Sequence, residues 1–137
     1  MTHTIQTDWK GEMAYEVETV GGKLKLDATP DEDGKAKGIT PKYLMLVSLA
    51  GCTSMDVTSL LDKMRAQVQD FKVEVEGNLT EEHPKHYDKV KMLYKFRGDD
   101  LQKDKIEKAV KLSVDRYCGV FEMFRQFAEV TYEIQYN

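Results

Sequence analysis

The chain has 137 residues, of which 41% are hydrophobic and 32% are charged, and its formal net charge is −4 at pH 7. This length fits a single domain, residues 1–137, with enough apolar side chains for a hydrophobic core. Lys and Glu are interspersed rather than gathered into a basic block, which argues against a nucleic acid or a membrane as partner and favours a small organic molecule or another protein.

The beginning of the chain, MTHTIQTDW, has no basic segment followed by an apolar run, and uninterrupted apolar stretches stay far below about 20 residues. This pattern predicts a cytoplasmic protein. In such a chain the two cysteines are expected to be buried hydrophobic residues or redox-active thiols rather than a structural disulfide.

A three-stranded meander is predicted from Thr4 to Thr29. Lys10-Gly11 is typical of a first turn, and Gly21-Gly22 is typical of a two-residue hairpin turn between strands of alternating polarity. From Pro30 to Thr40 the chain is polar and contains glycines, so a loop is predicted there.

A long helix is predicted from Pro41 to Met64, because Pro suits a first helical position and apolar residues then recur at helical spacing. Its first half, residues 43–50, is so apolar that the helix should be enclosed on most sides. Gly51 costs about 1 kcal/mol relative to Ala within a helix, which indicates that another backbone or a substrate comes close at that point.

A hairpin is predicted after this helix. Apolar residues alternate with charged residues from Phe71 to Leu79 and again from Tyr87 to Arg97, as expected of two half-buried strands. The intervening loop contains His83 and His86, a spacing that could hold a metal together with the cysteines. No CxxC or HExxH motif accompanies them, so a role in capping the loop is favoured and neither a metal nor another cofactor is expected.

Two helices and a last strand are predicted to complete the chain. Asp99 or Asp100 offers an N-cap for the first of these helices, and Gly119 is expected to break the helical pattern before it resumes. The strand follows from Val130 to Tyr136.

The predicted element order is therefore βββ-α-ββ-αα-β, which favours an α+β fold with antiparallel sheets around a long central helix. The other predicted elements of a single chain are too few to cover so apolar a helix on all sides. We therefore expect an intertwined homodimer in which two such helices bury each other and the N-terminal and C-terminal sheets merge across subunits.

The two cysteines differ in their local sequence. Cys52 lies within the apolar helix, where a cysteine is more often a small buried hydrophobe than a nucleophile. Cys118 precedes Gly119 and a new helical segment, so backbone N–H groups at a helix N-terminus and the nearby Arg116 would favour its thiolate.

Three residues near these cysteines are candidate walls of a substrate pocket. Met55 and Tyr117 suit a pocket or the plain core equally well. Phe121 is most simply explained by core packing, with the pocket as the alternative.

The segments PKYLMLVSLAGCT (41–53) and RYCGV (116–120) resemble the OsmC/Ohr family of osmotically inducible and organic-hydroperoxide-resistance proteins. Within it, GCTSMDV (51–57), EHPK (82–85) and LSVDRYC (112–118) are most similar to the YhfA-like branch. The resemblance covers essentially the whole chain. It implies an intertwined α+β dimer with its two cysteines on separate helices near the subunit interface.

The resemblance also implies a chemistry. Cys52 would attack an organic hydroperoxide, and Cys118 would resolve the resulting sulfenic acid to a disulfide, which an unidentified thiol reductant would reduce again. An apolar pocket would favour organic over hydrophilic peroxides, and the second thiol would protect the first from over-oxidation.

Two charged residues that usually accompany this chemistry in the family have no counterpart here. The Glu that follows the helix-starting Pro is replaced by Lys42, and no Arg occurs before Arg65. Lys37 or Lys42 is a candidate substitute; Lys42 is roughly 15 Å from Cys52 along a helix and would act on the partner subunit's thiol. These departures leave two alternatives, a binder of apolar ligands such as fatty acyl chains and a thiol redox sensor.

Overall fold

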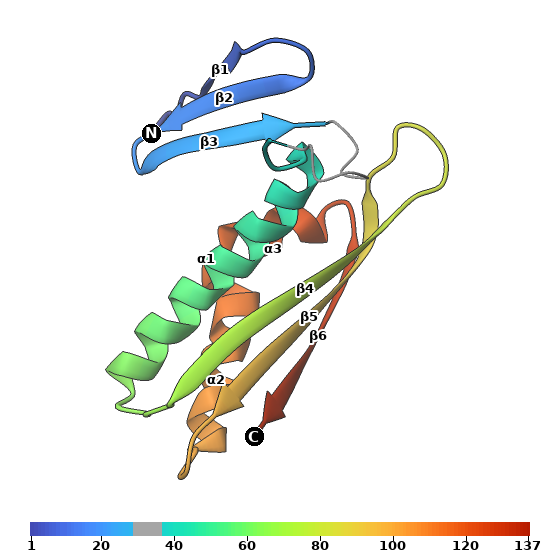
Figure 1. The fold of residues 1–137 in the computed structure, drawn as a ribbon. Coiled ribbons are helices and arrows are strands. Elements are labelled where there is room, and N and C mark those ends of the chain that lie inside the picture. Colours follow the sequence, from blue (N-terminus) through green and yellow to red (C-terminus); the bar gives the residue numbers. More distant parts are fainter. Residues whose placement is uncertain (29–36) are drawn as a thin grey trace. The chain divides into compact units, whose positions relative to one another are not determined.

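The computed structural model describes residues 1–28 and 37–137 (Figure 1). The chain divides into two compact units, Met1–Met45 and Leu46–Asn137, and each is described by itself. Residues 30–36 of the predicted loop and the last residue of the predicted meander, Thr29, lie outside the described residues.

The N-terminal unit contains the predicted meander. Strands β1 (Gln6–Trp9), β2 (Ala14–Thr19) and β3 (Gly22–Asp27) form an antiparallel sheet in that order. Thr19 pairs with Gly22, so the two turn residues are 20 and 21, one position earlier than predicted. The Lys10-Gly11 turn is confirmed, and Gly11 has the positive φ of 105° that a glycine adopts readily.

Helix α1 (Pro41–Lys63) confirms the predicted long helix to within one residue. Its buried residues recur every four positions and therefore form one face: Leu49, Thr53, Val57 and Leu61. The opposite face carries Val47, Gly51 and Met55, with Val47 58% and Met55 75% exposed. A Cβ added to Gly51 would meet nothing within 4 Å, so the close approach expected at this glycine does not come from within the described chain.

By length and composition alone, α1 could cross a membrane. Its most apolar 18-residue window has a mean hydropathy of 1.5, and 22% of that window is buried. The expectation that apolar stretches are too short holds for the nearly all-apolar segment 43–50, which contains Ser48, and not for the whole helix. One such helix is weak evidence for a membrane protein, because core helices of soluble proteins pass the same test.

The C-terminal unit contains a second three-stranded sheet, in the order β4 (Asp70–Leu79), β5 (Tyr87–Arg97) and β6 (Glu129–Tyr136). The β4–β5 hairpin is antiparallel, as predicted. The expectation of purely antiparallel sheets is wrong for β6, which pairs with β5 in parallel. The reason is that helices connect β5 to β6 and return the chain to the end of the sheet at which β5 began.

The connection consists of α2 (Lys103–Leu112), a π-helical turn η1 (Ser113–Tyr117) and α3 (Gly119–Arg125). The predicted N-cap is wrong: Gln102 occupies that position without a side-chain hydrogen bond, and the Asp99 carboxylate instead accepts one from Gln69. The predicted break at Gly119 lies one position earlier, because Cys118 has extended backbone angles and Gly119 is already the first residue of α3.

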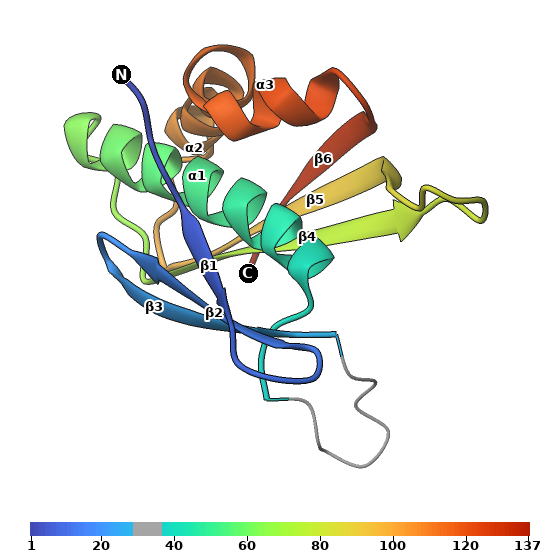
Figure 2. The same ribbon diagram turned by 90° about the horizontal axis from the view of Figure 1, so that it is seen from above.

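The core of the C-terminal unit lies between this sheet and the helices. Buried side chains of β5 alternate from Val90 onward, as predicted: Val90, Met92, Tyr94 and Phe96; Tyr87 at the start of the strand is also buried. They pack in one cluster with buried residues of α1, α2 and α3. Figures 1 and 2 show these helices along the same face of the sheet, which brings the middle of α1 close to the beginning of α3.

Candidate thiol site

Both cysteines lie in the C-terminal unit, on different elements. Cys52 is half-buried in the middle of α1, and Cys118 is the N-cap residue of α3, with 4% of its surface exposed. Both are free thiols, and their Sγ atoms lie within 4.8 Å of each other. Packing of α1 against α3 therefore brings together the two residues that the sequence singled out.

The Cys118 thiol is held by backbone hydrogen bonds. Its Sγ accepts one from the Phe121 N–H at 3.3 Å, and its own N–H donates to the Ser113 carbonyl at 2.8 Å. Burial raises the pKa of Cys118 well above its usual value; the Phe121 N–H opposes this, while Cys52 and Asp56 raise the pKa further. The predicted helix N-terminus is present, but its effect on the thiolate is outweighed by burial.

Asp56 is the third member of the site. It lies one helical turn after Cys52, and a carboxylate oxygen of Asp56 is within 4.8 Å of both Sγ atoms. Its Oδ2 accepts a hydrogen bond of 3.0 Å from the Ser113 hydroxyl. The charge next to the two thiols is thus negative, where the family's usual Arg would supply a positive charge.

A chain of buried hydroxyl groups ends at this carboxylate. Thr53 Oγ1 lies 2.7 Å from the Tyr94 hydroxyl and 2.8 Å from Ser113 Oγ. A hydroxyl has one proton, and a carboxylate can only accept, so the donors run in one direction: Tyr94 to Thr53, Thr53 to Ser113, Ser113 to Asp56. Tyr94 is a strong choice for the first donor, because burial raises its pKa to about 12 and keeps it protonated.

Sequence reasoning missed this chain of hydroxyl groups. Thr53, Tyr94 and Ser113 each stand at an apolar position of a helix or strand pattern, and such a position by itself indicates only core packing. All three are indeed fully buried. The available signal was that polar side chains stood at core positions, where each needs a hydrogen-bond partner.

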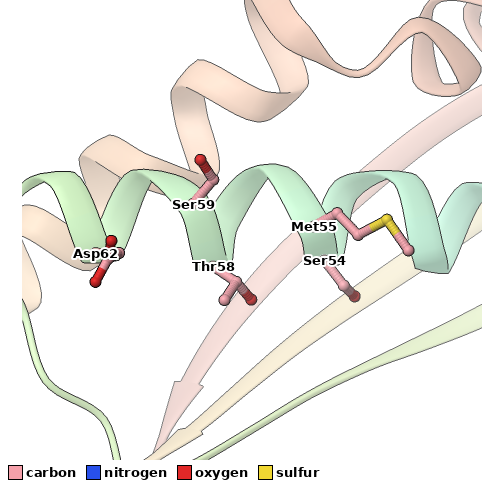
Figure 3. A pocket seen from close by; sticks show the side chains of 5 residues that line it. All are labelled: Ser54, Met55, Thr58, Ser59 and Asp62. Atoms are coloured by element: carbon pink, nitrogen blue, oxygen red, sulfur yellow. The ribbon is translucent and has the colours of Figure 1, made fainter.

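The three candidate pocket residues have different environments. Met55 lines an open depression of about 520 Å³ together with Ser54, Thr58, Ser59 and Asp62, all of them on α1 (Figure 3). Tyr117 is 51% exposed, and the Arg116 guanidinium lies over its ring at 5.5 Å. Phe121 is 3% exposed and belongs to the hydrophobic core, which is the simpler of its two expected roles.

The candidate charge substitutes lie in the other unit. Lys37 and Lys42 belong to Met1–Met45, whereas both thiols belong to Leu46–Asn137. The backbone N–H of Lys37 donates to the Asp27 carboxylate at 3.2 Å, within the N-terminal unit.

The histidines lie in the β4–β5 loop. The His86 N–H donates to Thr80 Oγ1 at 3.2 Å, and His86 Nδ1 lies 2.8 Å from the Pro84 carbonyl. These bonds close the loop, as expected of a capping residue.

Comparison with known proteins agrees with the fold. The sequence model of the family described as OsmC-like protein matches residues 34–133, which is most of the chain. The chain belongs to the OsmC-like family. Protein YhfA of Escherichia coli K12 is 29% identical to it over 105 residues, which cover 77% of this chain and 78% of YhfA.

Solved structures have the same fold over nearly their whole length. A hypothetical protein from Aquifex aeolicus VF5 is 27% identical, with a TM-score of 0.83, covering 100% of this chain and 98% of its own. An organic hydroperoxide resistance protein OsmC from Legionella pneumophila is 20% identical, with a TM-score of 0.68 and 98% coverage of both chains. OhrB, the organic hydroperoxide resistance protein of Bacillus subtilis, is 16% identical, with a TM-score of 0.68, covering 97% of this chain and 98% of its own. The predicted family and α+β fold are therefore confirmed.

Proposed function

We propose that this protein is a thiol-dependent reductase of organic hydroperoxides. The observation that carries the proposal is the proximity of two free thiols, Cys52 and Cys118, whose Sγ atoms lie within 4.8 Å although they come from different helices. The family adds support, because it includes proteins named for resistance to organic hydroperoxides.

The reaction has two steps. The Cys52 thiolate attacks the terminal oxygen of the hydroperoxide ROOH, the O–O bond breaks, and Cys52 becomes a sulfenic acid; the alkoxide that leaves takes up a proton from solvent to give the alcohol ROH. The Cys118 thiol then attacks the Cys52 sulfur; a disulfide forms, and the sulfenic hydroxyl leaves as water with the Cys118 proton. An external thiol reductant returns the disulfide to two thiols.

The environments of the two thiols support this assignment of roles. Cys52 is half-buried, whereas Cys118 is 4% exposed, so a hydroperoxide from solvent meets Cys52 first. The raised pKa of Cys118 keeps it protonated at neutral pH, which suits a thiol that waits for the sulfenic acid.

The exposed face of α1 supports a homodimer as the working form, and we propose the cytoplasm as its location. Val47, Gly51 and Met55 lie at four-residue spacing on this face, with two apolar side chains exposed and open space above the glycine. A glycine between apolar residues allows a second helix to approach closely. We infer that the α1 helices of two subunits pack against each other here and that the depression beside Met55 becomes the entrance for an apolar substrate.

Lys37 and Lys42 are proposed to replace the missing positive charge at Cys52. The test compares the rate of Cys52 oxidation in Lys37→Ala and Lys42→Ala with that in the unaltered protein. A drop in one variant identifies the substitute. If both single variants and the double variant oxidise Cys52 as fast as the unaltered protein, neither lysine supplies the positive charge at Cys52.

A steady-state assay tests the enzyme proposal. Consumption of cumene hydroperoxide and of hydrogen peroxide is measured with a small dithiol as reductant, using Cys52→Ser and Cys118→Ser as variants. Turnover that prefers cumene hydroperoxide and requires both cysteines is expected. Turnover that survives Cys52→Ser contradicts the assignment.

One observation favours the alternatives named from the sequence, a thiol sensor or a binder of apolar ligands. Asp56 places a negative charge beside the thiols, and this disfavours a reactive thiolate. The same assay separates the classes: one oxidation without turnover indicates a sensor, and unreactive thiols indicate a binder.

A further inference from the structure

We propose that the reduced thiol site binds a thiophilic divalent cation, best matched by Zn²⁺, through Cys52, Asp56 and Cys118. This goes beyond the proposed reductase activity and does not depend on it. The metal spacing considered in the sequence involved His83 and His86, whereas this set combines Cys52 and Asp56 with Cys118, which lies on a helix distant in the chain from the other two.

The positions of the ligand atoms support a single ion. Cys52 and Asp56 are four residues apart on α1 and share one face of that helix, and Cys118 approaches from the N-cap of α3. The two Sγ atoms and a carboxylate oxygen lie within 4.8 Å of one another. In a tetrahedral zinc site with Zn–S bonds of about 2.3 Å, two sulfurs are about 3.8 Å apart, so the two Sγ atoms need to approach each other by no more than about 1 Å.

The charges also favour a cation. A carboxylate beside two thiols places negative charge where thiolates would form, and this is unfavourable for a nucleophile but suits a cation with three anionic ligands. Thiolate ligands select Zn²⁺ and similar soft ions over Mg²⁺ or Ca²⁺.

Two of the ligands already have the outer partners that metal ligands usually have. The Phe121 N–H donates to Cys118 Sγ, and the Ser113 hydroxyl donates to Oδ2 of Asp56. Ser113 in turn accepts a hydrogen bond from Thr53, which accepts one from Tyr94. Such outer hydrogen bonds orient the ligands and are typical of built metal sites.

Three protein ligands leave the fourth position of a tetrahedral ion open for water or an external thiol. Disulfide formation would consume both thiolates, so the oxidised protein should not bind the ion. A bound ion should in turn shield both thiols from oxidation and alkylation.

Metal titration of the reduced, chelator-treated protein tests the proposal. Added Co²⁺ should give intense sulfur-to-cobalt charge-transfer absorption that saturates at one equivalent, and metal binding should release the thiol protons. One equivalent of Zn²⁺ should then remove the absorption by displacing Co²⁺. The same protein oxidised to its disulfide should give no such absorption. Absence of the absorption from the reduced protein, or its persistence in the oxidised protein, overturns the proposal.

Asp56→Asn and the matched variant Asp62→Asn, on the same helix but outside the cluster, test the third ligand. Asp56→Asn should weaken Zn²⁺ binding by more than about 10-fold, since losing even an outer partner costs that much, and Asp62→Asn should leave it unchanged. Circular dichroism checks that both variants fold.

If Asp56→Asn misfolds, the deciding measurement is alkylation of the unaltered protein, in which Zn²⁺ should protect both thiols. Lack of protection overturns the site. Equal affinities in two folded variants overturn it as well. If the protein does not reduce hydroperoxides, it should still bind Zn²⁺ at this site. Failure of the reductase proposal is therefore distinguishable from failure of the metal-site proposal.

Discussion

The Ser113 hydroxyl donates a 3.0 Å hydrogen bond to Oδ2 of Asp56 and so joins the π-helical turn to the helix that carries Cys52. Ser113 also accepts the Cys118 N–H through its carbonyl at 2.8 Å. One residue thereby positions both the carboxylate and the residue that carries the second thiol, and its own hydroxyl accepts a hydrogen bond from Thr53.

Thr53→Val should destabilise the protein, because the valine leaves the buried Tyr94 hydroxyl without its acceptor and Ser113 without its donor. The cost of such unsatisfied buried groups is about 1–3 kcal/mol. Thr58→Val, at an exposed position of the same helix, is the matched control and should change the free energy of unfolding by less than about 0.5 kcal/mol. Urea denaturation measures both, and equal values would show that the hydroxyl chain carries no stability.

Tyr94→Phe should alter how stability depends on pH. The folded pKa of Tyr94 is raised from 10.0 to about 12, so its contribution is fully present below pH 10 and is lost as the pH rises towards 12. A shift of this size corresponds to about 3 kcal/mol as an upper limit. The unfolding free energy should therefore fall less between pH 9 and pH 11 in Tyr94→Phe than in the unaltered protein. Parallel pH profiles would mean that Tyr94 titrates as it does in the unfolded chain.

The two thiols should differ in their reactivity in the metal-free, reduced protein. Cys52 is half-buried, whereas Cys118 is buried and has a raised pKa, so iodoacetamide at pH 7.5 should modify Cys52 first. Peptide mapping by mass spectrometry over time measures the order. Faster modification of Cys118 would reverse the roles assigned to the thiols.

Met55→Glu should dissociate the proposed dimer, because it places a charge in the apolar face of α1, where Met55 is 75% exposed in the single chain. Lys108→Glu, on the exposed face of α2, controls for added negative charge. Light scattering after gel filtration gives the mass, and a Met55→Glu protein that stays dimeric would exclude this face as the interface.

Much of the fold follows from the sequence because its patterns are local. The four-residue recurrence of Leu49, Val57 and Leu61 and the alternation along β5 each require only neighbouring residues, and both elements lie where the patterns predict. The parallel pairing of β6 could not be seen in this way, because that strand's own alternation is the same in either direction and only the path of the helical connection decides.

The site could be predicted only in part. Cys52 and Cys118 are conspicuous as the two cysteines of the chain, and the family resemblance links them. Asp56 was visible as a neighbour of Cys52, but its meeting with Cys118 depends on how α1 and α3 pack. The hydroxyl chain depends on contacts between Thr53, Tyr94 and Ser113, which belong to three elements, and no local pattern encodes such a contact.

The most direct measurement of the central claim is rapid mixing of the reduced protein with cumene hydroperoxide or hydrogen peroxide, followed by acid quench and mass spectrometry. We expect a fast reaction that prefers cumene hydroperoxide, is abolished in Cys52→Ser, and ends in a Cys52–Cys118 disulfide with two thiols lost per hydroperoxide. A reaction no faster than that of a free cysteine, or one that proceeds without Cys52, would contradict the claim that this pair of thiols reduces organic hydroperoxides.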